Sequence, residues 1–178
     1  MPTLLMINGP NLARLGARKP TIYGTTTLQE ITRQLQSLAA VHGWTVDAFQ
    51  SNHEGQIIDC LEARREVDAL IVNPGALMMN GWALRDALED FPAPWIEVHL
   101  SNIWSRESFR HTSILAPLAH GVIAGFGSHG YVLAATELIR RVGTAGSMPA
   151  ASVIDADTVN DGVGAGPTGR TSPHESND

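Results

Sequence analysis

The sequence lacks several features that define whole classes of protein. Its single cysteine, Cys60, excludes an internal disulfide and a cysteine-based metal site, and we expect this side chain to be a buried small hydrophobe. No segment approaches the roughly 18 apolar residues of a membrane span. Residues 1–7 lead into Asn8-Gly9-Pro10 without a signal-peptide pattern. These absences predict a soluble cytoplasmic protein with no membrane partner.

Runs of basic residues are also missing. The formal net charge is −6, and no stretch offers the stripe of cations that follows a nucleic-acid backbone, so nucleic acid is not an expected partner. A few cations instead fall in two segments that we interpret as loops, an arrangement that suits a small anionic ligand. These cations are Arg14, Arg18, Lys19, Arg106 and Arg110.

The chain divides by composition near residue 142. Up to that point it has enough apolar residues to bury one core. Residues 143–178 are rich in Gly, Ala, Ser, Thr and acidic residues and contain no aromatic residue. Such a composition buries too little apolar surface to offset the entropy of ordering. We therefore expect one domain over residues 1–142 and a disordered, low-complexity acidic tail over residues 143–178.

Within the domain, apolar runs alternate with segments of helical period. This alternation is typical of a parallel sheet with helices on both faces. We predict an α/β fold of the flavodoxin-like, doubly wound kind with a five-stranded parallel sheet, in which ligands bind beyond the carboxyl ends of the strands. The predicted strands are residues 3–7, 44–49, 69–72, 95–99 and 122–126.

Four helices are predicted, three between these strands and one after the last. Thr27 and Glu30 form a capping box before apolar residues at helical spacing, and Gly43 ends this first helix. Ser51 and Glu54 suggest a second capping pair. The segment from 99 to 121 gives no firm assignment beyond a short helix starting near residues 105–109. The remaining predicted helices are residues 54–65, 82–89 and 131–142.

The connection after the first predicted strand, residues 8–24, is far longer than such turns usually are, and long loops are often functional. It brings Arg18 and Tyr23 within reach of each other. Ionising a tyrosine at pH 7 requires roughly 4 kcal/mol, and an arginine at about 4 Å supplies a similar amount at an effective dielectric near 20. The pair therefore makes a phenolate base feasible, whereas the alternative is a solvated loop with a half-packed tyrosine.

Glu97 and His99 form the second candidate group. Residues two apart on a strand share a face, so the carboxylate can hold one ring nitrogen and favour the imidazolium, leaving the other nitrogen to protonate a leaving hydroxyl. The alternative is a buried, hydrogen-bonded pair without a catalytic task. Asn73-Pro74-Gly75-Ala76 and Ser101-Asn102 also follow strands and offer donors to a carboxylate, although both are ordinary turn formers.

Residues 125–130 read Gly-Phe-Gly-Ser-His-Gly, which fits the GxGxxG pattern of dinucleotide sites. A true fingerprint opens a βαβ unit with an acidic residue about 20 positions later. Only one predicted helix and the tail follow here. We therefore discount a dinucleotide site.

Taken together, several segments resemble the type II 3-dehydroquinate dehydratases, in order and at family-like spacing, from residue 3 to about 142. The resemblance implies a flavodoxin-like subunit in a homododecamer built from trimers, with no metal and no organic cofactor. The resemblance also implies that the small-molecule substrate is 3-dehydroquinate, which would be dehydrated to 3-dehydroshikimate in aromatic amino acid biosynthesis or quinate breakdown. The matching segments are Asn8-Gly9-Pro10-Asn11-Leu12, Leu15-Gly16, Arg18-x-Pro20-x-x-Tyr23-Gly24, Asn73-Pro74-Gly75, Arg85-Asp86-Ala87, residues 96–102 and Arg106-x-x-Phe109-Arg110.

The same resemblance assigns roles in an anti-elimination through an enolate. Tyr23 removes the C2 proton, Arg18 lowers the pKa of Tyr23, and Asn11 helps to stabilise the enolate. His99, oriented by Glu97, protonates the departing hydroxyl. The substrate carboxylate and hydroxyls are bound by Asn73, by the backbone at Leu100 and Ser101, and by Arg110. Asp86 reaches the site of another subunit across a subunit contact.

One segment departs from the family pattern. The family continues its Asn-Pro segment with an aromatic residue or Leu and then Thr-His-Thr-Ser, whereas this chain reads Leu77-Met78-Met79-Asn80-Gly81. Met79 thus replaces a substrate-binding histidine, and a thioether cannot donate a hydrogen bond. Asn80 is the candidate substitute. Two other classes stay open: a non-catalytic or altered-substrate relative that binds a small hydroxy acid, and a flavodoxin-like nucleotide- or flavin-binding module.

Overall fold

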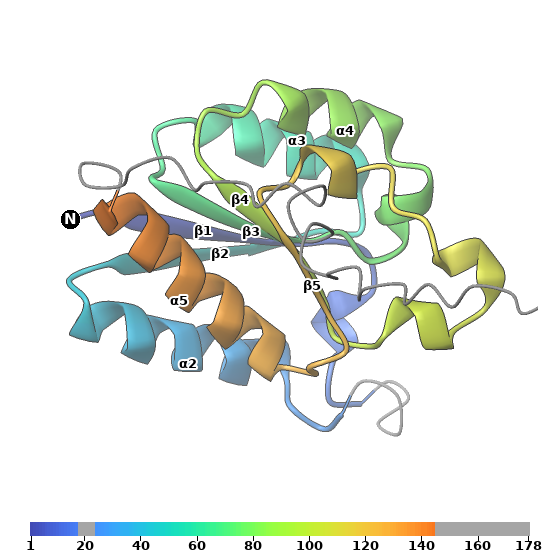
Figure 1. Cartoon of the computed structure of the whole chain (residues 1–178), viewed down its shortest axis with the longest axis horizontal. Coiled ribbons are helices and arrows are strands. Elements are labelled where there is room, and N and C mark those ends of the chain that lie inside the picture. Colours follow the sequence, from blue (N-terminus) through green and yellow to red (C-terminus); the bar gives the residue numbers. More distant parts are fainter. Residues whose placement is uncertain (18–23, 145–178) are drawn as a thin grey trace, which may run out of the picture. The chain divides into compact units, whose positions relative to one another are not determined.

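Five parallel strands form a single sheet that lies between two layers of helices (Figure 1). The computed structural model describes residues 1–17 and 24–144. Helices α2 and α5 cover one face of the sheet, and α3 and α4 cover the other. The strands are β1 (Thr3–Asn8), β2 (Thr45–Gln50), β3 (Ala69–Asn73), β4 (Trp95–His99) and β5 (Val122–Ala124); the helices are α2 (Leu28–Val41), α3 (Glu54–Ala63), α4 (Trp82–Glu89) and α5 (His129–Thr144).

The strand order is β2-β1-β3-β4-β5, so the chain winds outward in opposite directions from β1 and β3. Asn8 and Asn73 are register partners at the last positions of these two strands. In open α/β sheets, ligands bind at the carboxyl edge where the strand order reverses. The topology therefore directs attention to the residues that follow β1 and β3.

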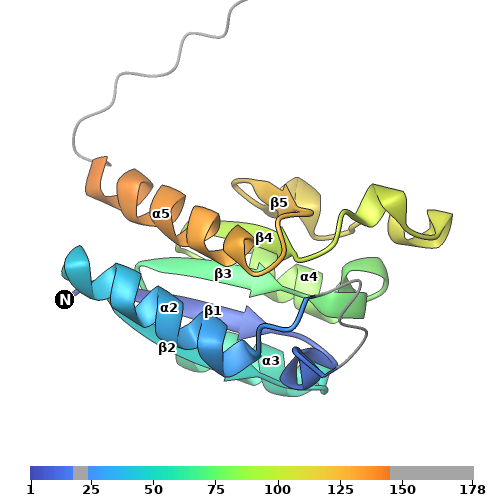
Figure 2. The ribbon, with the colours of Figure 1, turned by 90° about the horizontal axis from the view of Figure 1, so that it is seen from below.

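The core consists of two apolar clusters, one on each face of the sheet. Successive side chains of a strand point to opposite faces, so Leu4 and Met6 of β1 join the cluster under α2 and α5. Leu5 and Ile7 join the cluster under α3 and α4. Figure 2 shows α2 and α5 lying along their face of the sheet. A strand buried on both faces must be apolar throughout, which explains the continuous hydrophobic runs in the sequence.

The predicted capping box of the first helix is confirmed. Thr27 N–H donates to Glu30 Oε2 over 2.7 Å, and Glu30 N–H donates to Thr27 Oγ1 over 3.2 Å. After α2 the chain turns at Gly43, whose φ of 73° lies in the left-handed region that glycine adopts without strain. The start and end of α2 therefore follow from local sequence alone.

The predicted Ser51/Glu54 capping pair is wrong. Helix α3 begins after His53, and Ser51 Oγ instead accepts from His53 N–H over 2.9 Å and donates to Gln56 over 2.6 Å. The Glu54 carboxylate accepts from Leu84 N–H over 2.9 Å, so it caps the neighbouring helix α4, whose own N-cap glycine has no side chain to do so.

Three other details differ from the sequence prediction. Cys60 is half-buried rather than fully buried, because it packs at the margin of the α3 and α4 cluster. Strand β5 stops at Ala124, since Gly125 turns with a φ of 92° against Asn102. The segment from β4 to β5 holds three 3₁₀ turns, Ile103–Ser105, Ser108–Arg110 and Ala116–Leu118.

No helix in the described residues is long and apolar enough to cross a membrane.

Candidate active site

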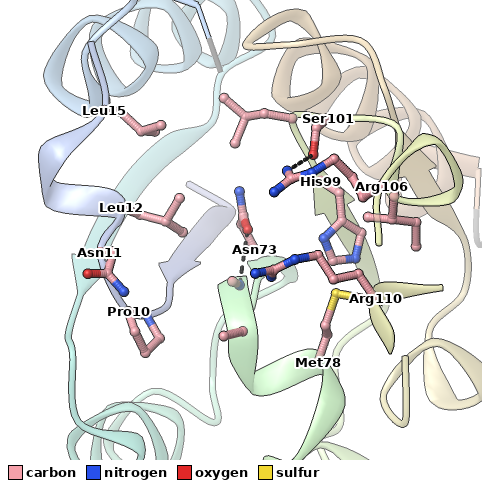
Figure 3. A pocket seen from close by; sticks show the side chains of 14 residues that line it. Pro10, Asn11, Leu12, Leu15, Asn73, Met78, His99, Ser101, Arg106 and Arg110 are labelled. Atoms are coloured by element: carbon pink, nitrogen blue, oxygen red, sulfur yellow. Dashed lines mark hydrogen bonds between the residues drawn. The ribbon is translucent and has the colours of Figure 1, made fainter. Parts of the chain in front are cut away.

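A small cavity lies at the carboxyl edge of the sheet, beside the ends of β1, β3 and β4 (Figure 3). We call it the strand-end cavity. Its volume is about 140 Å³, small beside the roughly 300 to 1,000 Å³ of sites for drug-sized ligands. It is lined by Pro10, Asn11, Leu12, Leu15, Asn73, Gly75, Ala76, Met78, His99, Leu100, Ser101, Ile103, Arg106 and Arg110.

The turns after β1 and β3 pack backbone against backbone to form the floor of this cavity. Gly9 N–H donates to the Asn73 carbonyl over 2.8 Å, and a Cβ on Gly9 would lie 2.2 Å from the Pro74 carbonyl oxygen. Gly75 has a φ of 57°, and its Cβ would meet the Pro10 carbonyl oxygen at 3.1 Å. Glycine is required at both positions because a side chain would separate the two turns.

Asn11 stands on the opposite side of the cavity from His99 and the two arginines in Figure 3. It is the one non-glycine residue with positive φ in the described chain, at 68°. Asparagine tolerates this left-handed conformation better than most residues. Its N–H donates to Asn52 Oδ1 over 2.8 Å, which holds the turn. The side chain is exposed and faces the cavity.

Glu97 and His99 form a hydrogen-bonded pair in which His99 lines the cavity and Glu97 lies behind it. His99 Nε2 lies 2.6 Å from Glu97 Oε1, and the two residues are only 5% and 0% exposed. Ser113 donates to the second carboxylate oxygen, Oε2, over 3.0 Å. The Ser113 oxygen also accepts from Leu115 N–H and Ala116 N–H, so its proton is directed to Glu97. This network fixes the imidazole with Nδ1 as the nitrogen not engaged by the carboxylate.

Two arginines bring positive charge to the same wall. Arg106 Nη1 donates to Ser101 Oγ over 3.3 Å, and Arg110 Nε donates to Glu107 over 3.0 Å while its guanidinium lies 4.9 Å from the Phe109 ring centre. The pKa of Glu107 is lowered, first by a hydrogen bond from its own backbone N–H and then by the positive charge of Arg106 and the contact with Arg110. The ionised Glu107 thus orients the arginines, which suit a carboxylate ligand.

Asn73 is held by a chain of buried hydrogen bonds. Its Nδ2 donates to the Tyr131 hydroxyl over 2.8 Å, and that hydroxyl donates to Asn8 Oδ1 over 2.6 Å. Asn73 Oδ1 accepts from Gly75 N–H over 3.2 Å. Burial raises the pKa of Tyr131, although the Asn73 bond opposes this shift, so the phenol keeps its proton. The amide that faces the cavity is therefore anchored to α5 and β1.

Several predicted site residues lie elsewhere. Arg18 and Tyr23 fall outside the described residues. Met79 and Asn80 lie at the end of the 3₁₀ turn Gly75–Met79 that follows β3 and do not line the cavity, whereas the preceding Met78 does and is buried. Asp86 lies on the exposed side of α4, with its carboxylate 4.0 Å from Arg85.

The structure also adds residues to the prediction. Arg106 and Met78 line the cavity, and Ser113 and Tyr131 support it from behind. The sequence had marked Arg106 as one of the loop cations suited to an anionic ligand and as part of a family-like segment, but had given it no role at the site. Ser113 and Tyr131 are 16 and 58 residues from their partners, and no local pattern marks such pairings.

A second cavity of about 510 Å³ lies beside the GxGxxG segment and shares Leu100, Ser101 and Arg106 with the first. Helix α5 follows this segment, but no further strand follows α5 in residues 24–144, so the described chain does not form the βαβ unit of a dinucleotide site. Within the same described part, no three His, Cys, Asp or Glu side chains gather as a metal site would require.

The fold and the cavity define a flavodoxin-like α/β protein with a Glu-His pair and paired arginines at its topological switch point. The family model for dehydroquinase class II matches residues 2–139. The chain is 54% identical to a 3-dehydroquinate dehydratase from Roseiflexus castenholzii, over 82% of this chain and 92% of that protein. It is 48% identical to a catabolic 3-dehydroquinase 2 from Neosartorya fischeri, over 80% and 95% respectively.

A solved structure is also similar. The type II dehydroquinase from Propionibacterium acnes superposes with a TM-score of 0.75 at 38% identity, covering 79% of this chain and 97% of that one. The chain belongs to the class II dehydroquinase family. Both the resemblance and the flavodoxin-like fold expected from the sequence are confirmed.

Proposed function

We propose that this protein dehydrates 3-dehydroquinate to 3-dehydroshikimate by anti-elimination through an enolate, with Tyr23 as base and His99 as acid. The observation that carries the proposal is the buried Glu97-His99 pair at the edge of a cavity that also presents two arginines. The substrate is a small hydroxy-keto acid, so it needs a cation for its carboxylate and a proton donor for its leaving hydroxyl.

The acid half of the reaction follows from the Glu97 network. With Nε2 held by the carboxylate, the imidazolium of His99 offers the Nδ1 proton toward the cavity. Ser113 occupies the other carboxylate oxygen and limits rotation of Glu97. A proton donor held in this way protonates the departing hydroxyl without first reorganising.

Binding of the substrate carboxylate and hydroxyls is assigned to Asn73, Arg110 and the backbone at Leu100 and Ser101. Asn73 still has one N–H free for a ligand after its bond to Tyr131. Asn11, across the cavity, supplies an amide for the enolate oxygen. Donors aimed at a developing oxyanion are often the largest single contribution to such catalysis.

The base half belongs to the segment after Asn11. Tyr23, activated by Arg18, removes the C2 proton as the resemblance implies. An arginine at about 4 Å offsets most of the roughly 4 kcal/mol needed to form phenolate at pH 7. The reaction uses neither a metal nor an organic cofactor in this proposal.

Assembly is part of the same proposal. We infer a homododecamer of trimers in which Asp86 from one subunit approaches the site of another. Its exposed position on α4 leaves the carboxylate accessible to a second copy. Large apolar side chains are also exposed and would be covered in such an assembly, namely Trp82, Trp104, Phe109 and Phe126.

An absorbance assay for the conjugated enone product, with 3-dehydroquinate and no added metal, tests the proposed function. We expect a steady increase in absorbance from purified protein. The Met78 and Met79 substitutions favour one alternative, a relative with altered substrate preference. Binding of 3-dehydroquinate without any product would contradict the proposed reaction and support a non-catalytic relative instead.

A further inference from the structure

We propose that Tyr131 is a positioning residue that fixes the orientation of the Asn73 amide at the strand-end cavity. Tyr131 does not line the cavity and has no part in the proposed proton transfers. Its hydroxyl is the link between Asn8 and Asn73, which end the two central strands. The consequence for ligand binding depends on the function proposed above, whereas the orientation of the amide does not.

The direction of the hydrogen bonds is set at Asn8. Its Nδ2 lies 3.4 Å from the Phe49 carbonyl oxygen, which can only accept. The amide oxygen of Asn8 must then face the Tyr131 hydroxyl, which is 2.6 Å away. Tyr131 has a single hydroxyl proton, and it donates this proton in the hydrogen bond to Asn8 Oδ1.

The same direction continues to the cavity. Because its proton is engaged, the Tyr131 oxygen can only accept from Asn73, so the NH₂ group of Asn73 must face it. The Asn73 oxygen then faces Gly75 N–H, which is a donor. Inverting the amide would place two acceptors against each other at one end and two donors at the other. One orientation is therefore strongly selected, and it leaves one N–H of Asn73 for a ligand.

Burial makes this selection effective. Asn8 and Tyr131 are fully buried and Asn73 is nearly so. Water therefore cannot replace a lost partner easily, and unpaired groups there are strongly disfavoured. An amide held at both ends loses little freedom when a ligand binds.

The test compares Tyr131→Phe, which removes only the hydroxyl, with Leu138→Ala. Leu138 is fully buried on the same helix and has no polar side-chain atom to join the hydrogen bonds, so we expect its truncation to destabilise the core and leave those bonds in place. Asn8→Ala serves as a second variant, because it frees the Tyr131 proton and should loosen Asn73 in the same way.

The first measurement is hydrogen exchange at the Gly75 amide, resolved by fragmentation mass spectrometry. We expect exchange about tenfold faster in Tyr131→Phe and Asn8→Ala, and little change in Leu138→Ala, because only the first two release the acceptor of Gly75 N–H. Equal exchange in wild type and Tyr131→Phe would overturn the proposal. This measurement needs no turnover, so it stands even if the proposed reaction fails.

The second measurement is steady-state kinetics with 3-dehydroquinate. Tyr131→Phe should raise KM about tenfold with kcat within about threefold of wild type, the pattern of lost uniform binding. In the Asn73→Ala background, Tyr131→Phe should have no further effect on KM, because the hydroxyl acts through Asn73. An unchanged effect in that background, or an equal one in Leu138→Ala, would show a merely structural role.

Discussion

Single residues at the strand-end cavity combine a structural and a chemical task. Asn11 adopts a left-handed conformation that few residues tolerate and also presents its amide to the cavity. Asn73 ends a central strand, accepts from Gly75 and still has an N–H for a ligand. A substitution at either position would therefore alter geometry and binding together. At Tyr23, by contrast, a substitution can remove the catalytic group without changing the fold or ligand binding.

Tyr23→Phe should abolish turnover and leave the fold and ligand binding intact, because only the proton acceptor is lost. Enone formation and equilibrium binding of 3-dehydroquinate, measured on the same preparation, check both parts. Residual activity within tenfold of wild type would assign the base to another group.

Ser113→Ala should lower kcat about tenfold, because Glu97 loses a hydrogen bond of a kind usually worth about 1.5 to 3 kcal/mol. Ser113→Thr keeps the hydroxyl and should restore most of the activity. Ser108→Ala, at an exposed position in the same segment, is the control and should match wild type. Equal activity in Ser113→Ala and wild type would mean that His99 does not depend on this contact.

Met79 is where the sequence leaves the family pattern. If the family histidine donates a hydrogen bond to a substrate hydroxyl, its absence should weaken binding by roughly 1 to 3 kcal/mol, or about 5- to 150-fold, with kcat in the ordinary range. Met79→His should then lower KM. Since Met78 rather than Met79 lines the cavity, Met78→Thr is a useful companion variant.

Asn80→Ala completes this comparison. A raised KM in Asn80→Ala, together with no improvement in Met79→His, would indicate that Asn80 has taken over the contact. If neither variant changes KM, the segment does not contact the substrate hydroxyl as the corresponding segment does in the family.

Sequence order accounts for much of this site but not for all of it. The rule that ligands bind beyond parallel strands directed attention to Asn73, His99 and Ser101, and all three line the cavity. Alternation along a strand paired Glu97 with His99. Ser113 and Tyr131 were not foreseen, since their contacts arise from tertiary packing between segments far apart in sequence.

At the scale of elements, sequence patterns predicted the bounds of a helix or strand well where the interactions that set those bounds lie within that element. The capping box placed the start of α2, and apolar runs placed all five strands within one or two residues at each end. The start of α3 was explained wrongly because Ser51 and Glu54 resemble a capping pair locally, whereas Glu54 bonds to α4. Such a bond between elements leaves no trace in local spacing.

The close approach of the turns after β1 and β3 gives a prediction about both elements. Gly9→Ala should lower the free energy of unfolding by about 3 kcal/mol or more, because its Cβ would overlap the Pro74 carbonyl. Gly55→Ala in α3, where a Cβ meets nothing within 4 Å, should raise it by about 0.5 to 1 kcal/mol. Urea unfolding at one protein concentration compares the two; a mild effect of Gly9→Ala would mean that the turns can separate freely.

At the scale of the whole molecule, the acidic tail provides a separate prediction. Deleting residues 146–178 should leave turnover and assembly nearly unchanged, because that composition offers little apolar surface to pack. Gel filtration and the enone assay on the truncated protein check this expectation. Loss of the oligomer would instead give the tail a role in assembly.

The position of β1 between β2 and β3 has a consequence for how the chain acquires its shape during synthesis. β1 precedes both of its neighbours in the chain, and Thr3 meets Thr45 and Asp68, which follow it by 42 and 65 residues. Pairings between such distant segments form slowly, and an apolar strand with both edges unpaired is prone to aggregate until its neighbouring strands have been synthesised and have paired with it. A nascent chain shorter than about 100 residues has no complete binding site, because His99 has not yet been added. The yield of folded protein should therefore depend on how long β1 stays unpaired, and not only on the stability of the finished protein.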